Sequence, residues 1–427
     1  MTEFTSETYQ NEYLPVGGTE VNAVVRVTAW GSSTPDGARS TGAAEIVLVD
    51  VSGSMNYPGT KIRAARDATA AAIDCIRDGV RFAIVAGTDV AREVYPGDGH
   101  LVEASDRTRA AAKKAVAGLK ARGGTAIGQW LMCADALFAG APGAIHHSIL
   151  LTDGRNENET ADELAAALSK CEGNFQCDCR GVGADWEVDE LRQIASTLLG
   201  DVALIREPRD MRGDFTEMME RAMGRAVNDV ALRVWAPQGA EVAFVKQVAP
   251  AIEDLSARRD TVNELTGDYP TGAWGDEARD YHVRVTVPPR AVGEEMLAAR
   301  VSLVVDGAAV SEAKIRALWT DDEALSTRVN GEVVRSTGHA EYAEAVQEGV
   351  AALREGDDRT ATKRLGRAAQ LAHALQDDAK LEEVGNVVDI DDPERGTVKI
   401  KGAVDDLDLQ ALDAHSTKTT RTRKPAS

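Results

Sequence analysis

Short apolar runs alternate with amphipathic segments from Ala43 to Val227, and this alternation constrains the fold more than any other feature of the sequence. The runs "AEIVLVD" and "RFAIVAG" are continuous and apolar, as strands buried on both faces are. Between them, residues 61–76 carry apolar side chains at helical spacing. The alternation continues through "SILLTD" to a last predicted helix over residues 214–227. The pattern predicts an α/β fold: a Rossmann-like, doubly wound, mostly parallel sheet with helices on both faces.

The hydrophobic period changes to two after Asn228. Residues 281–287, "YHVRVTV", place alternate side chains on opposite faces, as in a half-buried strand. We expect one hairpin within residues 229–248, turning around Pro237-Gln238-Gly239, and a second within 299–319, turning at Asp306-Gly307. This part of the chain is therefore predicted to form an antiparallel β-sandwich domain.

An isolated strand at residues 21–30 has no partner nearby in the sequence, and we expect it to join the antiparallel sheet. Two helices around Gly356 resemble a tetratricopeptide helix pair, but one pair is too short for a solenoid and indicates a small helical region. The predicted domains are an N-terminal strand segment joining the β domain (1–42), a doubly wound domain (43–227), an antiparallel β-sandwich (228–320), a helical region (321–385) and a charged, partly disordered tail (386–427).

Charge and composition limit which classes of partner and which cellular location we expect for this protein. The formal net charge is -21, from 48 Lys and Arg against 69 Asp and Glu. This charge repels nucleic acids and anionic membranes, so we expect neither as a partner. The first ten residues lack the features of a signal peptide, and no apolar run reaches the roughly 18 residues that a membrane helix needs. The five cysteines, an odd number in a long chain, favour reduced thiols and a cytoplasmic location.

Polar side chains follow two of the predicted parallel strands where each strand ends. Asp50-x-Ser52-x-Ser54 follows the first strand, and Asp153-Gly154 ends the strand "SILLTD". Thr125 comes directly after a pair of glycines, which permit a tight turn and a close backbone approach. Because ligands bind outside the carboxyl ends of strands in open α/β sheets, we expect these side chains to meet at one edge.

These side chains offer oxygen ligands alone, which suit a hard cation such as Mg²⁺. Two carboxylates roughly cancel the charge of a divalent ion, and three hydroxyls add coordination without adding charge. An ion held in this way stays electrophilic and keeps a position for an outside ligand, preferably a carboxylate. We therefore predict a Mg²⁺ site, with Mn²⁺ and Ca²⁺ as alternative ions.

The three motifs together resemble the metal-ion-dependent adhesion site of von Willebrand factor A (VWA) domains, over roughly residues 44–226. The resemblance implies five residues at the metal site: Asp50, Ser52, Ser54, Thr125 and Asp153. It also implies that a glutamate or aspartate of a protein partner completes the coordination. The regions outside the domain resemble a bacterial intracellular group in which VWA units accompany regulatory or stress-related systems.

The predicted function is a metal-dependent protein-binding module that recognises an acidic side chain of its partner. One alternative is a scaffold subunit of a larger machine in which the metal is purely structural. A metal-assisted hydrolase is less favoured, because Ser52 and Ser54 have no histidine base nearby and the Gly-x-Ser-x-Gly elbow is absent. We assign no catalytic residue and no organic cofactor, and do not expect an enzyme.

Two further features have simpler interpretations. Cys171, Cys177 and Cys179 lie close together, but a zinc site needs a fourth ligand and no histidine is near them in sequence. Thiols without a metal are therefore the favoured interpretation. The segment "STKTTRTRK", residues 416–424, is interpreted as a solvated end. The alternative is that a kinase phosphorylates threonines from Thr417 to Thr422, so that a phosphothreonine reader binds them.

Overall fold

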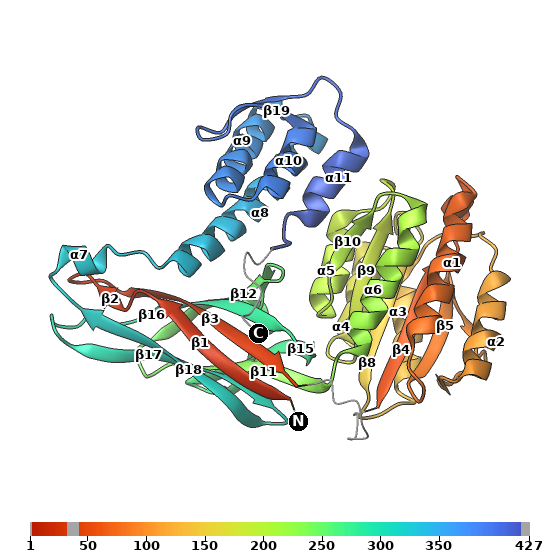
Figure 1. Cartoon of the computed structure of the whole chain (residues 1–427), viewed down its shortest axis with the longest axis horizontal. Helices are drawn as coiled ribbons and strands as arrows, with labels where there is room; N and C mark the ends of the chain where they lie inside the picture. The colour runs from red at the N-terminus through yellow and green to blue at the C-terminus, as the bar shows by residue number, and fades with distance from the viewer. Residues whose placement is uncertain (1, 32–41, 420–427) are drawn as a thin grey trace. The chain divides into compact units, whose positions relative to one another are not determined.

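The computed structural model describes residues 2–31 and 42–419 (Figure 1). The chain forms two compact units: one combines Met1–Ser32 with Asp229–Ser427, and the other is Ser33–Asn228. The second unit is therefore inserted in sequence between two parts of the first. Within the described ranges, no helix is both long enough and apolar enough to cross a membrane.

The inserted unit is built on a seven-stranded sheet whose central strands are parallel. Its strands are β4 (Ala43–Asp50), β5 (Arg81–Gly87), β6 (Ala91–Tyr95), β7 (Val102–Glu103), β8 (Ile145–Thr152), β9 (Gln176–Val182) and β10 (Val202–Ile205). The order is β10-β9-β8-β4-β5-β6, with β6 and β7 antiparallel to β5. The predicted doubly wound, mostly parallel sheet is confirmed.

Six helices and two short 3-10 turns cover this sheet. They are η1 (Gly53–Asn56), α1 (Thr60–Cys75), α2 (Asp106–Ala117), α3 (Ile127–Phe138), α4 (Ala161–Cys171), α5 (Val188–Thr197), η2 (Pro208–Asp210) and α6 (Met211–Met223). Helices α1, α2 and α6 bury apolar side chains in one core with the sheet, while α3, α4 and α5 lie on the other face (Figure 1). The alternating pattern arises because each central strand is buried by helices on both sides.

The other unit contains two mostly antiparallel sheets. The five-stranded sheet has the order β1-β3-β16-β12-β13, and the six-stranded sheet has the order β14-β15-β11-β17-β18-β2. Their strands are β1 (Glu3–Gln10), β2 (Tyr13–Leu14), β3 (Glu20–Trp30), β11 (Val227–Trp235), β12 (Glu241–Ala249), β13 (Glu253–Asp254), β14 (Asp260–Asn263), β15 (Thr266–Trp274), β16 (Ala278–Thr286), β17 (Glu295–Val305) and β18 (Ala308–Trp319), with η3 (Ser256–Arg258) after β13. The sheets pack through side chains such as Phe4 and Trp274, whose ring centroids are 5.9 Å apart.

Strand β3, which the sequence left without a partner, pairs along its length with β16, so that Val25 lies opposite Tyr281. Its other edge pairs with β1, a strand that the periodicity did not reveal because its side chains are exposed or only half-buried. In the structure the antiparallel sheets therefore take strands from both sides of the inserted unit.

The two hairpins predicted in this unit have different outcomes. Strands β17 and β18 pair as expected, with Asp306 and Gly307 both at positive φ in the turn. The hairpin predicted around Pro237-Gln238-Gly239 is wrong, because β11 pairs with β17 and β12 pairs with β16, in different sheets. Gly239, at φ +86°, does turn the chain there. A period of two shows which face of a strand is buried, but not which strand it pairs with.

The C-terminal part of this unit consists of helices and a small hairpin. Its elements are α7 (Glu323–Ser326), α8 (Gly331–Glu355), α9 (Asp358–Ala374), α10 (Asp378–Val387), β19 (Val388–Asp392), β20 (Thr397–Ile400) and α11 (Asp406–His415). Helices α8 and α9 are joined at Gly356, which ends α8 in the left-handed conformation with φ +77°. Tyr342, Leu365, Val384 and Leu412 share one buried core.

Residues 388–419, which lie within the segment predicted to be a charged and partly disordered tail, form the hairpin β19–β20 and helix α11. Val388, Val398 and Leu412 are buried, and they anchor the hairpin and α11 to the helical core. These anchors stand singly among charged residues, so they give no continuous periodic signal. Residues 420–427 lie outside the described part of the chain.

Candidate metal centre

Asp50 and Asp153, the two carboxylates among the predicted site residues, lie at one edge of the parallel sheet. Strands β4 and β8 are adjacent and parallel, with Val49 opposite Leu151. Asp50 therefore ends β4 beside Thr152, whose hydroxyl donates a hydrogen bond of 2.6 Å to Oδ2 of Asp50. Asp153 follows directly, so that both carboxylates reach the same edge. Both side chains are fully buried.

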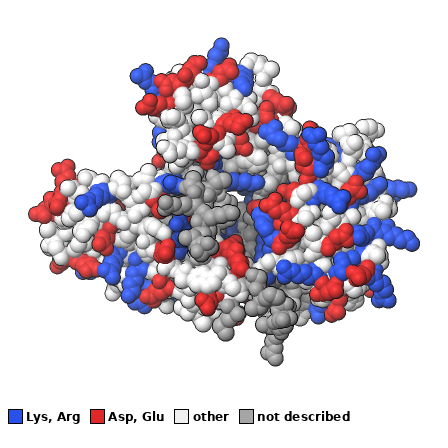
Figure 2. Space-filling model, viewed as in Figure 1, with Lys and Arg blue, Asp and Glu red and all other residues white. Residues whose placement is uncertain are grey.

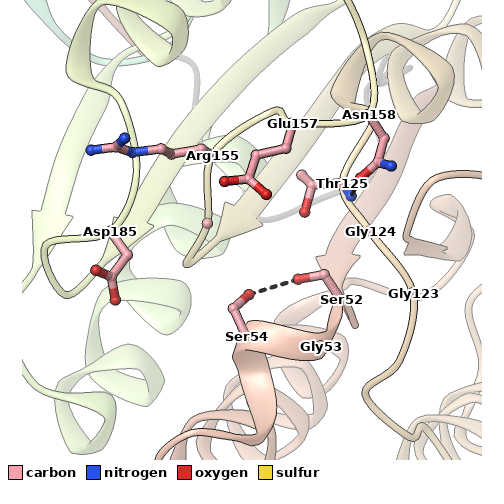
Figure 3. A pocket seen from close by; sticks show the side chains of 11 residues that line it. Ser52, Gly53, Ser54, Gly123, Gly124, Thr125, Arg155, Glu157, Asn158 and Asp185 are labelled. Atoms are coloured by element: carbon pink, nitrogen blue, oxygen red, sulfur yellow. Dashed lines mark hydrogen bonds between the residues drawn. The ribbon is translucent and has the colours of Figure 1, made fainter.

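The loop after β4 folds back over Asp50, the last residue of that strand. The N–H of Ser52 donates to Oδ1 of Asp50 at 2.7 Å, so both carboxylate oxygens of Asp50 are occupied by donors. The short turn η1 then brings the hydroxyl oxygens of Ser52 and Ser54 to within 2.8 Å of each other (Figure 3). Ser54 also donates to Oδ1 of Asp153 at 2.6 Å, which links the loop to β8.

Thr125 reaches the cluster from the loop before α3. Gly123 adopts φ +87°, which favours glycine, and its carbonyl accepts a hydrogen bond of 3.0 Å from the N–H of Gly53. A Cβ added at Gly154 would lie 3.1 Å from Oγ of Ser54 and 3.8 Å from Oγ1 of Thr125. The missing side chain at residue 154 thus leaves room for the two hydroxyls to approach. We call Asp50, Ser52, Ser54, Thr125 and Asp153 the oxygen cluster.

Burial changes the electrostatics of the cluster. It raises the pKa of Asp50 to about 6, because the charged form loses its hydration. Hydrogen bonds from Ser52 and Thr152 oppose this shift, whereas the nearby charge of Asp153 adds to it. A divalent cation beside the two acids would favour their charged forms, since an opposite charge stabilises a carboxylate.

Lys61 touches the cluster and was missed by the sequence reasoning. It is the second residue of α1, and its Nζ lies 2.7 Å from Oδ2 of Asp153. The side chain is 9% exposed, so the ion pair is shielded from water. The sequence did contain one signal. The helix dipole disfavours a cation in the first turn of a helix, so a lysine at that position indicates a nearby negative charge.

The cluster opens into a cavity of about 360 Å³ (Figure 3). In the close-up, the hydroxyls of Ser52, Ser54 and Thr125 face the same hollow from two different loops. The cavity mouth carries charged groups that the motifs did not include: Arg155, Glu157 and Asp185. Arg155 pairs with Glu187 at 2.9 Å. The mouth thus presents both signs of charge next to a cluster of neutral and acidic oxygens.

The donor chemistry fits a hard divalent cation. Every side chain of the cluster offers oxygen, and two of the five are carboxylates, a set that suits Mg²⁺. Across residues 2–31 and 42–419, no group of three or more His, Cys, Asp or Glu side chains could hold a metal ion. A metal at this edge would therefore depend on hydroxyl ligands as well as on the two carboxylates.

The five cysteines are free thiols. Cys171, Cys177 and Cys179 are buried, with the sulfurs of the last two 4.0 Å apart. Burial raises the pKa of Cys171 to about 12, which keeps this thiol protonated and unreactive.

Comparisons with known proteins agree with the fold and with the motifs. The family model of the von Willebrand factor type A domain matches residues 44–203. A solved structure of a von Willebrand factor type A protein from Catenulispora acidiphila is 50% identical, with a TM-score of 0.93, over 98% of this chain and 97% of that chain. The chain therefore belongs to the von Willebrand factor type A family. Domains of this family generally mediate metal-dependent protein interactions and are typically not enzymes.

A more distant solved structure shows the fold alone, and a curated sequence matches half of the chain. The ArnB paralog VWA2 from Sulfolobus acidocaldarius is 14% identical with a TM-score of 0.57, and 97% of this chain and 98% of that chain are covered. The "Uncharacterized protein sll0103" of Synechocystis is 28% identical over 217 residues, 50% of each chain. The chain thus spans about half the length of this curated relative.

Proposed function

We propose that this protein is a metal-dependent protein-binding module and that the oxygen cluster is its metal-ion-dependent adhesion site. Asp50 and Asp153 would supply the charge for a divalent cation, with Mg²⁺ the first candidate, and the three hydroxyls would complete its inner ligands. A bound cation would supply an open coordination position for a carboxylate of a partner protein. The convergence of five oxygen-bearing side chains from three separate loops beside one open cavity carries this proposal.

Hydrogen bonds within the chain support this proposal. Hydrogen bonds from Ser52 and Thr152 orient the carboxylate of Asp50, and Ser54 orients that of Asp153. Orientation by neighbouring donors is what fixes a metal ligand in place before the ion binds. The cavity is large enough for an acidic side chain to enter from solvent.

A protein partner suits the surface better than a nucleic acid does. The net charge is -21, and basic side chains are interspersed with acidic ones on the face that Figure 2 shows. Phosphate binding draws instead on clustered Lys and Arg. The free cysteines fit a reducing compartment, so we further propose an intracellular regulatory or stress-related setting.

The test is capture of partners from an extract of the native host by the full-length protein, in Mg²⁺ or in EDTA. We expect a partner that is retained by the parent in Mg²⁺ and lost in EDTA and with Thr125→Ala. A partner retained equally by the parent and by Asp50→Asn in EDTA would favour the scaffold alternative. Turnover of a phosphoester or ester that is abolished by Asp50→Asn would favour the hydrolase alternative.

A further inference from the structure

Lys61 places a positive charge directly on one of the two acids of the oxygen cluster. Its Nζ is 2.7 Å from Oδ2 of Asp153, and the other oxygen of that carboxylate accepts from Ser54. On its outer side, Nζ lies 3.9 Å from Oδ2 of Asp185, a side chain that is 80% exposed at the cavity mouth. The amine therefore lies between the carboxylates of Asp153 and Asp185.

Helix stability does not explain this lysine. A cation in the first turn of α1 opposes the helix dipole, and the first turn contains no acidic residue to offset it. Burying an ammonium group is also costly unless a charge partner is at hand. Asp153 is that partner, so the position of Lys61 is tied to the oxygen cluster.

The charge count follows from these contacts. Two carboxylates and one ammonium leave the cluster with a net charge of minus one. A divalent cation would change the sum to plus one, and an added carboxylate would return it to zero. With Lys61 absent, the cation alone would neutralise the two acids, and an added carboxylate would leave an excess negative charge. In a buried site these differences are weakly screened.

We infer that Lys61 makes the binding of a divalent cation and of a partner carboxylate mutually dependent, so that each binds more tightly when the other is present. This inference rests on the proposed function, because it concerns the same site. Coupling between two ligands is reciprocal and commonly amounts to about 5–150-fold in affinity. A site coupled in this way would bind the metal more weakly before an acidic partner arrives than after it.

The experiment titrates Mn²⁺ into the full-length protein at pH 7.5 and follows the free ion by electron paramagnetic resonance. Each titration is run in sodium acetate, as the carboxylate probe, and in sodium chloride of equal ionic strength. Lys61→Met removes the charge and Lys61→Arg keeps it. Lys114→Met, at an exposed position of α2, makes the same charge change away from the cluster. Circular dichroism verifies that each variant is folded.

For the parent, we expect acetate to raise the Mn²⁺ affinity. For Lys61→Met, we expect about tenfold tighter Mn²⁺ binding in chloride, with the acetate effect lost or reversed. Lys61→Arg and Lys114→Met should keep the acetate effect of the parent. A purely structural ion pair would alter stability but not the acetate dependence.

Equal Mn²⁺ affinity and equal acetate dependence in the parent and in Lys61→Met would overturn the inference. If Lys61→Met does not fold, the parent alone still tests the inference, because equal Mn²⁺ affinities in acetate and in chloride would contradict coupling. Failure of the proposed function looks different: neither the parent nor Lys61→Met would bind Mn²⁺ under any condition, and both would match Asp50→Asn.

Discussion

A Cβ atom added at Gly124 would lie 1.8 Å from Oδ1 of Asn158. The same oxygen accepts a hydrogen bond of 2.9 Å from the N–H of Thr125. The N–H of Asn158 donates in return to the carbonyl of Thr125, also at 2.9 Å. The two hydrogen bonds between Thr125 and Asn158 therefore hold the loop before α3 against the loop after β8. They require that residue 124 has no side chain.

Replacing Gly124 with Ala should push Asn158 away and release Thr125. We expect the free energy of unfolding to fall by about 1–3 kcal/mol, as for other overpacked sites. The increase in melting temperature on adding Mg²⁺ should shrink, because Thr125 would no longer be held beside the oxygen cluster. Differential scanning calorimetry with and without Mg²⁺ measures both effects.

The matched control is Gly213→Ala in α6, where an added Cβ meets nothing within 4 Å. Alanine is favoured over glycine in a helix by about 0.5–1 kcal/mol, so this variant should be at least as stable as the parent. It should respond to Mg²⁺ as the parent does. A full Mg²⁺ response in Gly124→Ala would show that the contact with Asn158 does not position Thr125.

Removing a carboxylate from the oxygen cluster should abolish metal stabilisation without unfolding the sheet. Asp50→Asn keeps the size of the side chain but loses its charge, whereas Thr125→Ala removes a neutral oxygen. At a concentration 100 times its Kd, a ligand stabilises the fold by about 2.7 kcal/mol. We expect Mg²⁺ to raise the melting temperature of the parent, to raise that of Thr125→Ala less, and to leave Asp50→Asn unchanged.

Asp67→Asn, at an exposed position of α1, makes the same charge change outside the cluster and should respond as the parent does. If Mg²⁺ and Mn²⁺ do not stabilise the parent, or stabilise Asp50→Asn equally, the oxygen cluster does not bind these metals.

Much of the inserted unit was predictable from sequence because its signals are local. Each central strand is covered on both faces, so its residues form an unbroken apolar run that periodicity detects. The antiparallel sheets were less predictable. Their alternation shows a buried face, but the pairing of β3 with β16 joins residues 250 or more positions apart. Strand β1 gave no signal, since it carries polar side chains on a sheet edge.

The five motif residues were predictable because each follows a strand end or a glycine pair, and topology brings such positions together. Lys61 and Asn158 were not. Lys61 belongs to an amphipathic helix, where a charged residue normally faces solvent, and its burial depends on how α1 begins after η1. Asn158 contacts Thr125 across 33 residues, through a glycine whose role is visible only in three dimensions.

A second buried charge cluster lies across three strands of the same sheet. The Nδ1 of His147 is 2.7 Å from Glu45, and its Nε2 is 3.0 Å from Asp178. Burial lowers the pKa of His147, but the two acids outweigh it and raise the pKa to about 9, against a reference value near 6.5. Burial raises the pKa of Asp178, but the hydrogen bond and charge of His147, together with the charges of Arg225 and Arg180, outweigh it and hold this pKa well below its usual range.

Because the folded pKa of His147 is above its unfolded value, its charge stabilises the fold fully below pH 6.5, and this contribution is lost as pH rises through 9. We expect the stability difference between the parent and His147→Gln to shrink by on the order of 3 kcal/mol between pH 6 and pH 9.5. Urea unfolding of residues 42–228 at each pH measures it. His100→Gln, at an exposed position, is the control and should show no such trend. A pH-independent difference for His147→Gln would contradict the assignment.

Deleting residues 2–31 should destabilise the antiparallel sheets and spare the inserted unit. The deletion removes β3, which lies between β1 and β16 and pairs with both. It also removes the side-chain hydrogen bonds and the ion pair between Arg26 and Asp280. We expect loss of the corresponding calorimetric transition, while a separate 42–228 fragment unfolds cooperatively. An unchanged transition in the truncated protein would show that β3 is dispensable.

The last prediction concerns Thr419, which is buried although residues 416–424 were interpreted as a solvated end. Thr419 is 8% exposed, its hydroxyl donates to the carbonyl of Val248 at 2.9 Å, and its N–H donates to that of Pro250 at 2.8 Å. Thr420 and Thr422 lie outside the described residues. A phosphate or carboxylate at residue 419 would replace a buried donor with a charged acceptor facing a carbonyl oxygen.

We therefore expect Thr419→Glu to lower the free energy of unfolding of its unit by about 2 kcal/mol or more. Thr417→Glu, at a half-buried position two residues earlier, should change it by about 0.5 kcal/mol. Chemical unfolding of the two variants and of the parent provides the comparison. If Thr419→Glu is as stable as Thr417→Glu, Thr419 does not fasten this segment to β12, and a kinase could reach it without unfolding the chain.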